Sequence, residues 1–173
     1  KPPRNCRVSA KDLLIDPALL DYDQVVADLD EIRRYNPQRF EMEQLTAVIY
    51  EDLEEYACAG YKDIGRDEFW VRGHMPDMPL MPGVIQCECA AQLGGFYALK
   101  YDVIKCEYMG FGGMKDVRFR KPVLPGCRLD LICQIAQIRA RKLVYFQFQG
   151  FVDAEMMFEG TMSGVAIGNA AES

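Results

Sequence analysis

Residues 73–100 read GHMPDMPLMPGVIQCECAAQLGGFYALK. The second part of this stretch, from Gly83 to about Lys100, starts just after Pro82 and predicts one long helix. Its apolar residues surround the helix instead of forming one stripe: Val84, Ile85, Cys87, Ala90, Ala91, Leu93, Phe96 and Leu99. A helix without a polar face is buried on most sides. The segment therefore predicts a helix at the centre of the fold.

Short segments on both sides of this helix predict β-strands, because they are rich in β-branched and aromatic residues. The upstream candidates are LTAVIY (45–50), EEYACAGYKDI (54–64) and DEFWVRG (67–73). The downstream candidates are KDVRFR (115–120), RLDLICQIAQIRA (128–140), KLVYFQFQGFV (142–152) and EMMFEGTMSGVAI (155–167). One buried helix against a long, mostly antiparallel sheet predicts an α+β architecture.

Residues 1–27 are expected to form a helical extension, and residues 28–173 a single domain, because no linker or repeat divides the chain. A helix is expected from about Gln24 to Arg34, ending before the Asn-Pro pair that follows. The apolar residues of the extension should cover a surface groove or an assembly interface, with a free tail as the alternative. These residues are Leu13, Leu14, Ile15, Leu19 and Leu20.

Composition excludes several classes of protein. The 173 residues suffice for one domain, and 50% of them are hydrophobic, enough for a buried core. The net charge of −6 argues against general nucleic-acid binding. No apolar run reaches the roughly 20 residues of a membrane span, and the polar start does not resemble a signal peptide. Seven cysteines then indicate reduced thiols in the cytoplasm, and a single histidine excludes metal sites that need two imidazoles.

Residues 73–92 combine three features of a catalytic site. His74 precedes a proline-stiffened loop, so a rigid backbone should hold its imidazole. The backbone N–H groups of Gly83 and Val84 open the helix without intrahelical partners and can bind an oxyanion. Glu88 lies in a helix without a polar face, a setting that suits a general acid better than a solvated surface residue. A structural histidine and a solvated glutamate are the alternative interpretation.

Two segments resemble one known family. GHMPDMPLMPG, followed by Glu88 and Gln92, is similar to the signature of 3-hydroxyacyl-acyl-carrier-protein dehydratases of the FabZ type. That signature is G-H-F-P, a short gap, P-(apolar)-x-P-G-V, and then E-A-x-A-Q. MGFGGMKDVRFRKPVLPGCRLDL (109–131) resembles the later family stretch G-x-D-x-V-R-F-R-R-P-V-x-P-G-D-x-L. The resemblance covers roughly residues 29–167.

The resemblance implies a hot-dog fold, a long helix wrapped by an antiparallel sheet, which agrees with the pattern above. It also implies a dimer that pairs two sheets edge to edge, often assembled into a trimer of dimers. In the family the active site lies at the dimer interface, with a histidine from one subunit and an acidic residue from the other. Those positions are His74 and Glu88 here. The implied partner is an acyl carrier protein, and no metal or organic cofactor is implied.

The chain departs from the family pattern at several positions. Met75 replaces the Phe of G-H-F-P. Where the family reads P-H-R-Y-P-F-L-L-V-D-R, this chain reads PQRFEMEQLTA, with Gln38 for the His, Phe40 for the Tyr and Thr46 for the Asp. These changes fall near the expected acyl tunnel and bear on substrate identity more than on reaction type. The residues expected to line or support the tunnel are Met75, Pro82 and Gln92.

The predicted reaction is loss of water from a (3R)-3-hydroxyacyl thioester to give a trans-2-enoyl thioester. His74 and Glu88 would move the two protons, and the family assignment favours His74 as the base. The N–H groups of Gly83 and Val84 would stabilise the enolate-like thioester oxygen.

Two alternatives remain open. In an acyl thioesterase Glu88 would activate water, which leaves His74 without a role. A non-catalytic acyl-carrier or lipid-binding module would not need the His74 and Glu88 pair.

A basic window is expected to receive the acyl carrier protein. Residues 115–142 carry a net charge of +6 within an acidic chain. Acyl carrier proteins are acidic, so a local positive surface would steer their approach. The expected docking residues are Arg118, Arg120 and Lys121. Scattered solvated charges are the alternative.

Overall fold

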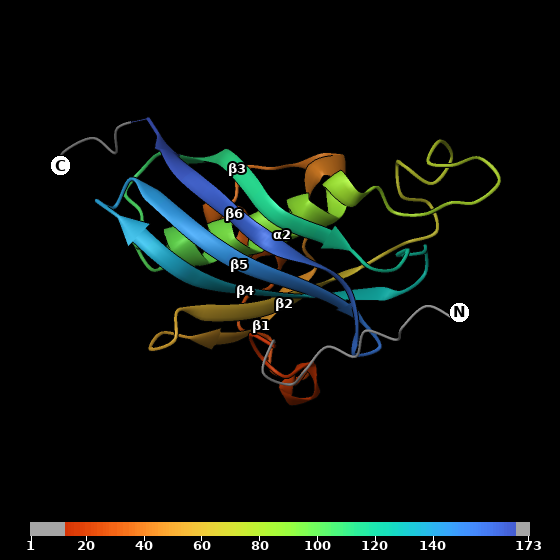
Figure 1. Ribbon diagram of the computed structural model, residues 1–173, viewed down its shortest axis with the longest axis horizontal. Helices are drawn as coiled ribbons and strands as arrows, with labels where there is room; N and C mark the ends of the chain where they lie inside the picture. Colours follow the sequence, from red (N-terminus) through yellow and green to blue (C-terminus); the bar gives the residue numbers. More distant parts are fainter. Residues whose placement is uncertain (1–12, 169–173) are drawn as a thin grey trace.

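The computed structural model describes residues 13–168, in which a six-stranded antiparallel sheet packs around one long helix (Figure 1). The central helix is α2 (Gly83–Lys100). The strands are β1 (Ala47–Asp52), β2 (Ala57–Asp63), β3 (Tyr108–Phe119), β4 (Arg128–Arg139), β5 (Leu143–Val152) and β6 (Glu155–Ile167). Their order in the sheet is β1-β2-β4-β5-β6-β3. The α+β architecture of the hot-dog type, expected from the sequence, is confirmed.

Helix α2 forms the core with the inner face of the sheet. Leu93 and Phe96 of this helix are completely buried, and Phe146 and Phe148 of β5 are 1% exposed. Each such side chain contributes about 1.5–3 kcal/mol through its burial. Helix and sheet approach closely at Gly94, where an added Cβ atom would lie 3.0 Å from the ring of Phe146. Within residues 13–168, no helix has the length and apolar composition needed to cross a bilayer.

Strand β3 is an edge of the sheet (Figure 1). It pairs with β6 along its length, and no other described strand lies beside it. Four of its large apolar side chains are 44–58% exposed: Tyr108, Phe111, Met114 and Phe119. Because the backbone groups of an edge strand can pair with another chain, this edge offers a surface for assembly.

The N-terminal segment covers part of the outer face of the sheet. Alternate residues of the strands, such as Ile49, Ile132 and Phe151, form a second apolar cluster on that face. Leu20 is buried in this cluster, and residues 13–15 pack against it. The expectation that apolar residues of the extension cover a surface is therefore confirmed for these positions. Leu19 is 70% exposed in the single chain, so its cover by a groove or an assembly interface stays a prediction. The division into residues 1–27 and 28–173 stays a prediction.

The helix expected from Gln24 to Arg34 begins later. Helix α1 spans Leu29–Tyr35, because the Asp28 side chain caps it by accepting the N–H of Glu31 at 2.9 Å. The preceding residues belong to the sheet, where the N–H of Ala27 donates to the Val48 carbonyl at 3.1 Å. Two short 3₁₀ turns, η2 (Pro17–Leu19) and η3 (Phe40–Met42), complete the described elements. The expected helical extension is wrong for residues 13–27, where η2 is the only helical element, and its first part lies outside the described residues.

The strand expected in DEFWVRG (67–73) does not form. This segment is a series of turns in which the N–H groups of Gly73 and His74 both donate to the Trp70 carbonyl, at 3.1 and 2.8 Å. Trp70 is only 4% exposed. The aromatic residue that suggested a strand is thus buried under a loop, and it does not pair in a sheet.

Candidate active site

Three hydrogen bonds to main-chain groups hold His74 in place. Its N–H donates to the Trp70 carbonyl at 2.8 Å, and its own carbonyl accepts the N–H of Leu80 at 2.9 Å. Its ring Nδ1 lies 2.9 Å from the Leu80 carbonyl oxygen. Because a carbonyl can only accept, Nδ1 carries a proton, and in the neutral imidazole Nε2 is the basic nitrogen. The loop therefore presents His74 with Nε2 as a base.

A buried ion pair anchors the start of this loop. Lys62 Nζ of β2 lies 3.0 Å from Glu68 Oε1, and the two side chains are only 9% and 14% exposed. Glu68 also accepts the backbone N–H of Gly65 with Oε1, and its carbonyl accepts the N–H of Val71 at 2.9 Å. The chain is thus fixed to the sheet before it reaches His74.

His74 lines a cavity of about 610 Å³ at the N-terminus of helix α2. Its lining includes Gly83 and Val84. The first hydrogen bonds of the helix run from the N–H groups of Ile85 and Gln86 to the Pro82 carbonyl, so those of Gly83 and Val84 precede the helical ladder. The structure thus places the predicted base and the predicted oxyanion donors in one cavity.

The absence of a side chain at Gly83 allows close packing at the start of the helix. An added Cβ atom there would lie 2.6 Å from the ring of Phe119, which comes from the end of β3. Because Gly83 has no Cβ atom, the ring of Phe119 can approach the backbone at the start of the helix closely.

Glu88 is oriented by two side-chain amides. Its Oε1 accepts from Gln92 Nε2 at 2.8 Å and from Gln38 Nε2 at 3.4 Å. The amide of Gln92 is itself fixed, because its Oε1 accepts the N–H of Gln44 at 2.9 Å and its Nε2 also donates to the Met42 carbonyl at 2.7 Å. Among the described residues, no hydrogen bond reaches Glu88 Oε2. This oxygen is left for a ligand.

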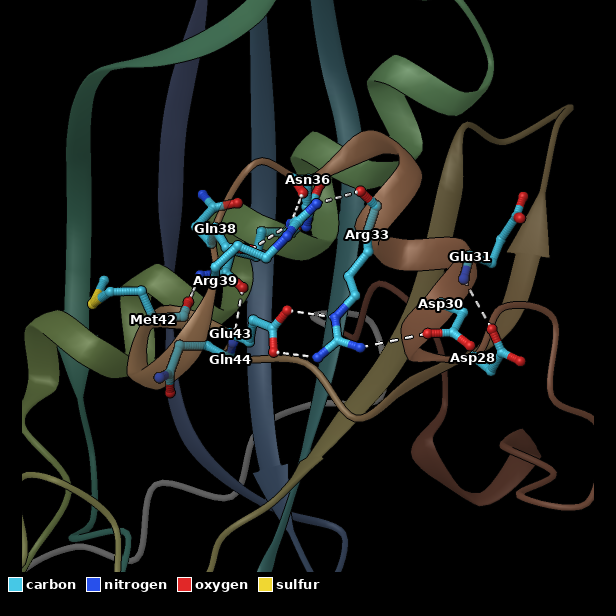
Figure 2. Close-up of polar contacts among 11 residues, drawn as sticks. Asp28, Asp30, Glu31, Arg33, Asn36, Gln38, Arg39, Met42, Glu43 and Gln44 are labelled. Carbon is cyan, nitrogen blue, oxygen red and sulfur yellow. Dashed lines mark hydrogen bonds and ion pairs between the residues drawn. The ribbon is translucent and has the colours of Figure 1, made fainter.

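The segment that carries Gln38 is shaped by two arginines (Figure 2). Arg33 binds both carboxylate oxygens of Glu43, at 2.6 and 2.9 Å. Arg39 donates to the carbonyls of Asn36 and Arg33, at 2.8 and 3.0 Å. Asn36 in turn donates to the Gln92 carbonyl of helix α2 at 3.0 Å. Residues 36–44 are therefore held over the part of α2 that carries Glu88.

Glu88 lines a second, smaller cavity of about 80 Å³. Apart from Glu88 and its amide neighbours, the walls are mostly apolar and come from α2, β3, β5 and β6. They include Ala91, Gly95, Leu99, Met109, Phe111, Phe146 and Met162. Such a surface suits a hydrocarbon chain.

His74 and Glu88 line different cavities, and within the described residues no hydrogen bond joins them. Pro82 borders the His74 cavity, and Gln92 borders the Glu88 cavity. Met75, expected near the tunnel, lines neither of these two cavities and is 46% exposed. A single chain thus provides two parts of a site without bringing them together.

Of the three predicted docking residues, two have acidic partners. Arg120 pairs with Glu159 and Lys121 with Glu155, both from β6, whereas Arg118 forms no ion pair within residues 13–168. The partners lie outside the window 115–142 but beside it in the sheet, because β3 and β6 are antiparallel neighbours. The free positive charge is therefore smaller than the sequence window suggested. Arg120 and Lys121 nevertheless border the His74 cavity.

The two cysteines beside Glu88 are core residues. Cys87 is 4% exposed and Cys89 is fully buried. Burial raises the pKa of the Cys87 thiol to about 11 and that of Cys89 further still. Both therefore remain neutral thiols, unsuited to nucleophilic or metal chemistry.

Comparison with known proteins gives concordant results. The model of a FabA-like domain matches residues 36–161. The 3-hydroxyacyl-[acyl-carrier-protein] dehydratase FabZ of Nitratidesulfovibrio vulgaris (strain DP4) is 32% identical over 152 residues, 87% of this chain and 94% of that protein. The enzyme of the same name from Clostridium beijerinckii is 36% identical over 113 residues, 65% of this chain and 80% of that protein.

Solved structures share the fold at low identity. The dehydratase heterocomplex ApeI:P from Xenorhabdus doucetiae aligns with a TM-score of 0.65 and 18% identity, covering 82% of this chain and 93% of that chain. Cj0977, a sigma28-regulated virulence protein from Campylobacter jejuni, aligns with a TM-score of 0.62 and 19% identity, covering 86% and 98%.

Proposed function

The chain belongs to the FabA-like family, and we propose that it dehydrates 3-hydroxyacyl thioesters, carried on an acyl carrier protein, to trans-2-enoyl thioesters. It is thus a hydro-lyase of fatty-acid-type biosynthesis. The observation that carries this proposal is the His74 cavity, where a basic Nε2 adjoins free N–H groups at a helix N-terminus. These are the groups that α-proton removal from a thioester requires.

In the proposed reaction, His74 Nε2 removes the α-proton. The N–H groups of Gly83 and Val84 stabilise the negative charge that develops on the thioester oxygen. Glu88 transfers a proton from Oε2 to the departing hydroxyl group, and water leaves. Two observations support these roles. A main-chain carbonyl binds the His74 ring, and the Gln92 amide donates a hydrogen bond to Glu88 Oε1.

Assembly into a homodimer would complete the site. The separate cavities of His74 and Glu88 support an arrangement in which each site takes one residue from each subunit. The free edge of β3 supports pairing of two sheets, and Phe111 of this strand also borders the Glu88 cavity. A second subunit at this edge would therefore help to enclose the acyl chain. Three such dimers would assemble further into a trimer of dimers.

The acyl carrier protein would dock beside the His74 cavity. Arg120 and Lys121 border that cavity, and exposed Arg118 lies next to it in β3. A carrier docked there would direct its thioester toward the start of α2. A cytoplasmic location, suggested by the seven cysteines, stays a prediction.

The proposal is tested with trans-2-enoyl thioesters of graded chain length. A dehydratase hydrates them reversibly, so the absorbance of the conjugated enoyl group should fall. A saturated acyl thioester without a 3-hydroxyl group should release no free thiol. Thiol release without hydration would instead establish a thioesterase, and neither reaction would indicate a binding module.

A further inference from the structure

The Gln38 side chain has a buried oxygen without a partner. Its Nε2 donates to Glu88 Oε1 at 3.4 Å, while its Oε1 is buried and receives no hydrogen bond from the described residues. Exchanging the amide nitrogen and oxygen of Gln38 would place Gln38 Oε1 against Glu88 Oε1. Both atoms are acceptors, so the orientation with Nε2 toward Glu88 is the favourable one. Buried carbonyl oxygens in native proteins nearly always have a donor. The unpaired oxygen therefore points to a donor from outside the chain, on a ligand or a water molecule.

The neighbouring amides donate to other acceptors. Asn36 Nδ2 is bound to the Gln92 carbonyl, and Gln92 Nε2 is bound to Glu88 and to the Met42 carbonyl. The nearby cavity walls from β3 and β5 include apolar Met109 and Phe146. A hydroxyl group or water that enters next to Glu88 would meet Gln38 Oε1 as an unused acceptor.

The backbone at Gln38 is fixed in place. Arg39 Nη1 donates to the Gln38 carbonyl at 2.6 Å and to the Asn36 carbonyl at 2.8 Å. Pro37 precedes Gln38 and restricts the chain further. Figure 2 shows the Gln38 side chain pointing away from the ion pair between Arg33 and Glu43. The unpaired oxygen is thus presented from a rigid segment.

We propose that Gln38 binds the leaving hydroxyl group of the substrate through Oε1, an inference that rests on the proposed dehydratase function. The C3–O bond breaks with its electron pair on oxygen, and Glu88 supplies the new proton. The original O–H of the hydroxyl group donates to Gln38 Oε1. The electrons of the α-C–H bond form the C2–C3 double bond, and that proton goes to His74.

The geometry suits this role because one amide group separates Gln38 Oε1 from the Glu88 carboxylate. Gln38 and Glu88 line the same cavity, so a hydroxyl group that enters it lies next to both side chains. In the hydration direction, Gln38 would hold the attacking water while Glu88 accepts its proton. Gln38 is therefore assigned to the hydroxyl side of the reaction and not to α-proton removal.

The test compares Gln38→Met, which loses both amide groups, with Gln38→His, whose ring keeps a donor and an acceptor. Gln38→Met should lower kcat for dehydration about 10-fold, the effect of one hydrogen bond, and leave KM for the thioester within about twofold. Gln38→His should restore kcat to within about threefold. Gln147→Met makes the same change at an exposed position of β5 and should behave as wild type.

A second measurement separates this role from a structural one. Exchange of the α-proton of a saturated acyl thioester in D₂O uses His74 but has no hydroxyl group, so Gln38→Met should leave it unchanged. Equal loss of exchange and dehydration, or loss of neither, would overturn the proposal. If Gln38→Met does not fold, Gln38→Asn, which withdraws the amide by one methylene, should show the same selective loss. Absence of dehydration by the wild type would instead overturn the proposed function itself.

Discussion

The two cavities along helix α2 hold their functional side chains by different means. His74 is fixed by main-chain groups, since its ring and its backbone bind Leu80 and Trp70. Glu88 is fixed by the side-chain amides of Gln92 and Gln38. The His74 cavity has about 610 Å³ and borders basic residues, whereas the Glu88 cavity has about 80 Å³ and mostly apolar walls.

This difference indicates how a substrate would lie. The larger cavity, with its N–H groups and basic border, suits the thioester and the carrier arm, and the smaller one suits the acyl chain. It also indicates which half is easier to change. Side-chain substitutions cannot remove the carbonyls that hold His74, but a single substitution removes an amide from Glu88.

The largest expected effect comes from removing either functional group. His74→Ala and Glu88→Gln should each lower enoyl hydration by about 10²–10⁴-fold, because each loses one positioned proton-transfer group. Circular dichroism and gel filtration should show a folded, assembled protein for both. Near-normal turnover in a folded His74→Ala variant would contradict the assigned mechanism.

Mixing these two variants tests whether the two cavities meet across subunits. In an equal mixture that exchanges subunits, half of the dimers are mixed, and each contains one intact site. Activity should therefore recover to about a quarter of wild type. Subunit exchange is checked by mass spectrometry of differently tagged chains. Full exchange without recovery would place both residues in a site within one chain.

Breaking the ion pair behind the His74 loop should affect only that half of the site. Glu68→Gln leaves Lys62 buried without its counter-ion, so the free energy of unfolding should fall by about 3 kcal/mol. Turnover should fall about 10-fold as the loop loosens. Glu155→Gln breaks the half-exposed pair with Lys121 and should change the free energy of unfolding by less than about 1 kcal/mol in urea titrations. Equal losses in both variants would refute a special role for the buried pair.

The smallest effect is expected at the border of the His74 cavity. Arg118→Glu should raise KM for a carrier-linked substrate about threefold, and less at high salt, with no change for a short soluble thioester. Arg120 and Lys121 are poorer test positions, because a reversal there would also break their ion pairs with Glu159 and Glu155. Lys142→Glu reverses an exposed charge in the same window away from the cavity and serves as the control. Equal effects on both substrates would show that the carrier protein docks on another surface of the molecule.

The sequence determined the elements whose signals are local. Helix α2 was predicted from Gly83 to about Lys100 and spans those residues, because its apolar surface and the preceding proline act within a few residues. The strands after it were predicted from β-propensity and alternation in the same way, except that β3 begins at Tyr108, well before the predicted start at Lys115. His74, Glu88 and the start of α2 could be proposed from the sequence because they lie within one short motif. The same local reasoning failed at residues 67–73, since aromatic and β-branched residues also pack under turns.

Only the tertiary structure decided which distant polar groups meet. Gln38 and Glu88 are 50 residues apart, and Gln44 and Gln92 are 48 apart, so no local pattern could pair them. The partners of Arg120 and Lys121 likewise came from a strand outside their window. Periodicity and capping depend on neighbours along the chain, whereas hydrogen bonds and ion pairs between elements depend on the packing of α2 and the loops against the sheet. The sequence therefore indicated the candidate reacting residues, and the fold determined how each one is held.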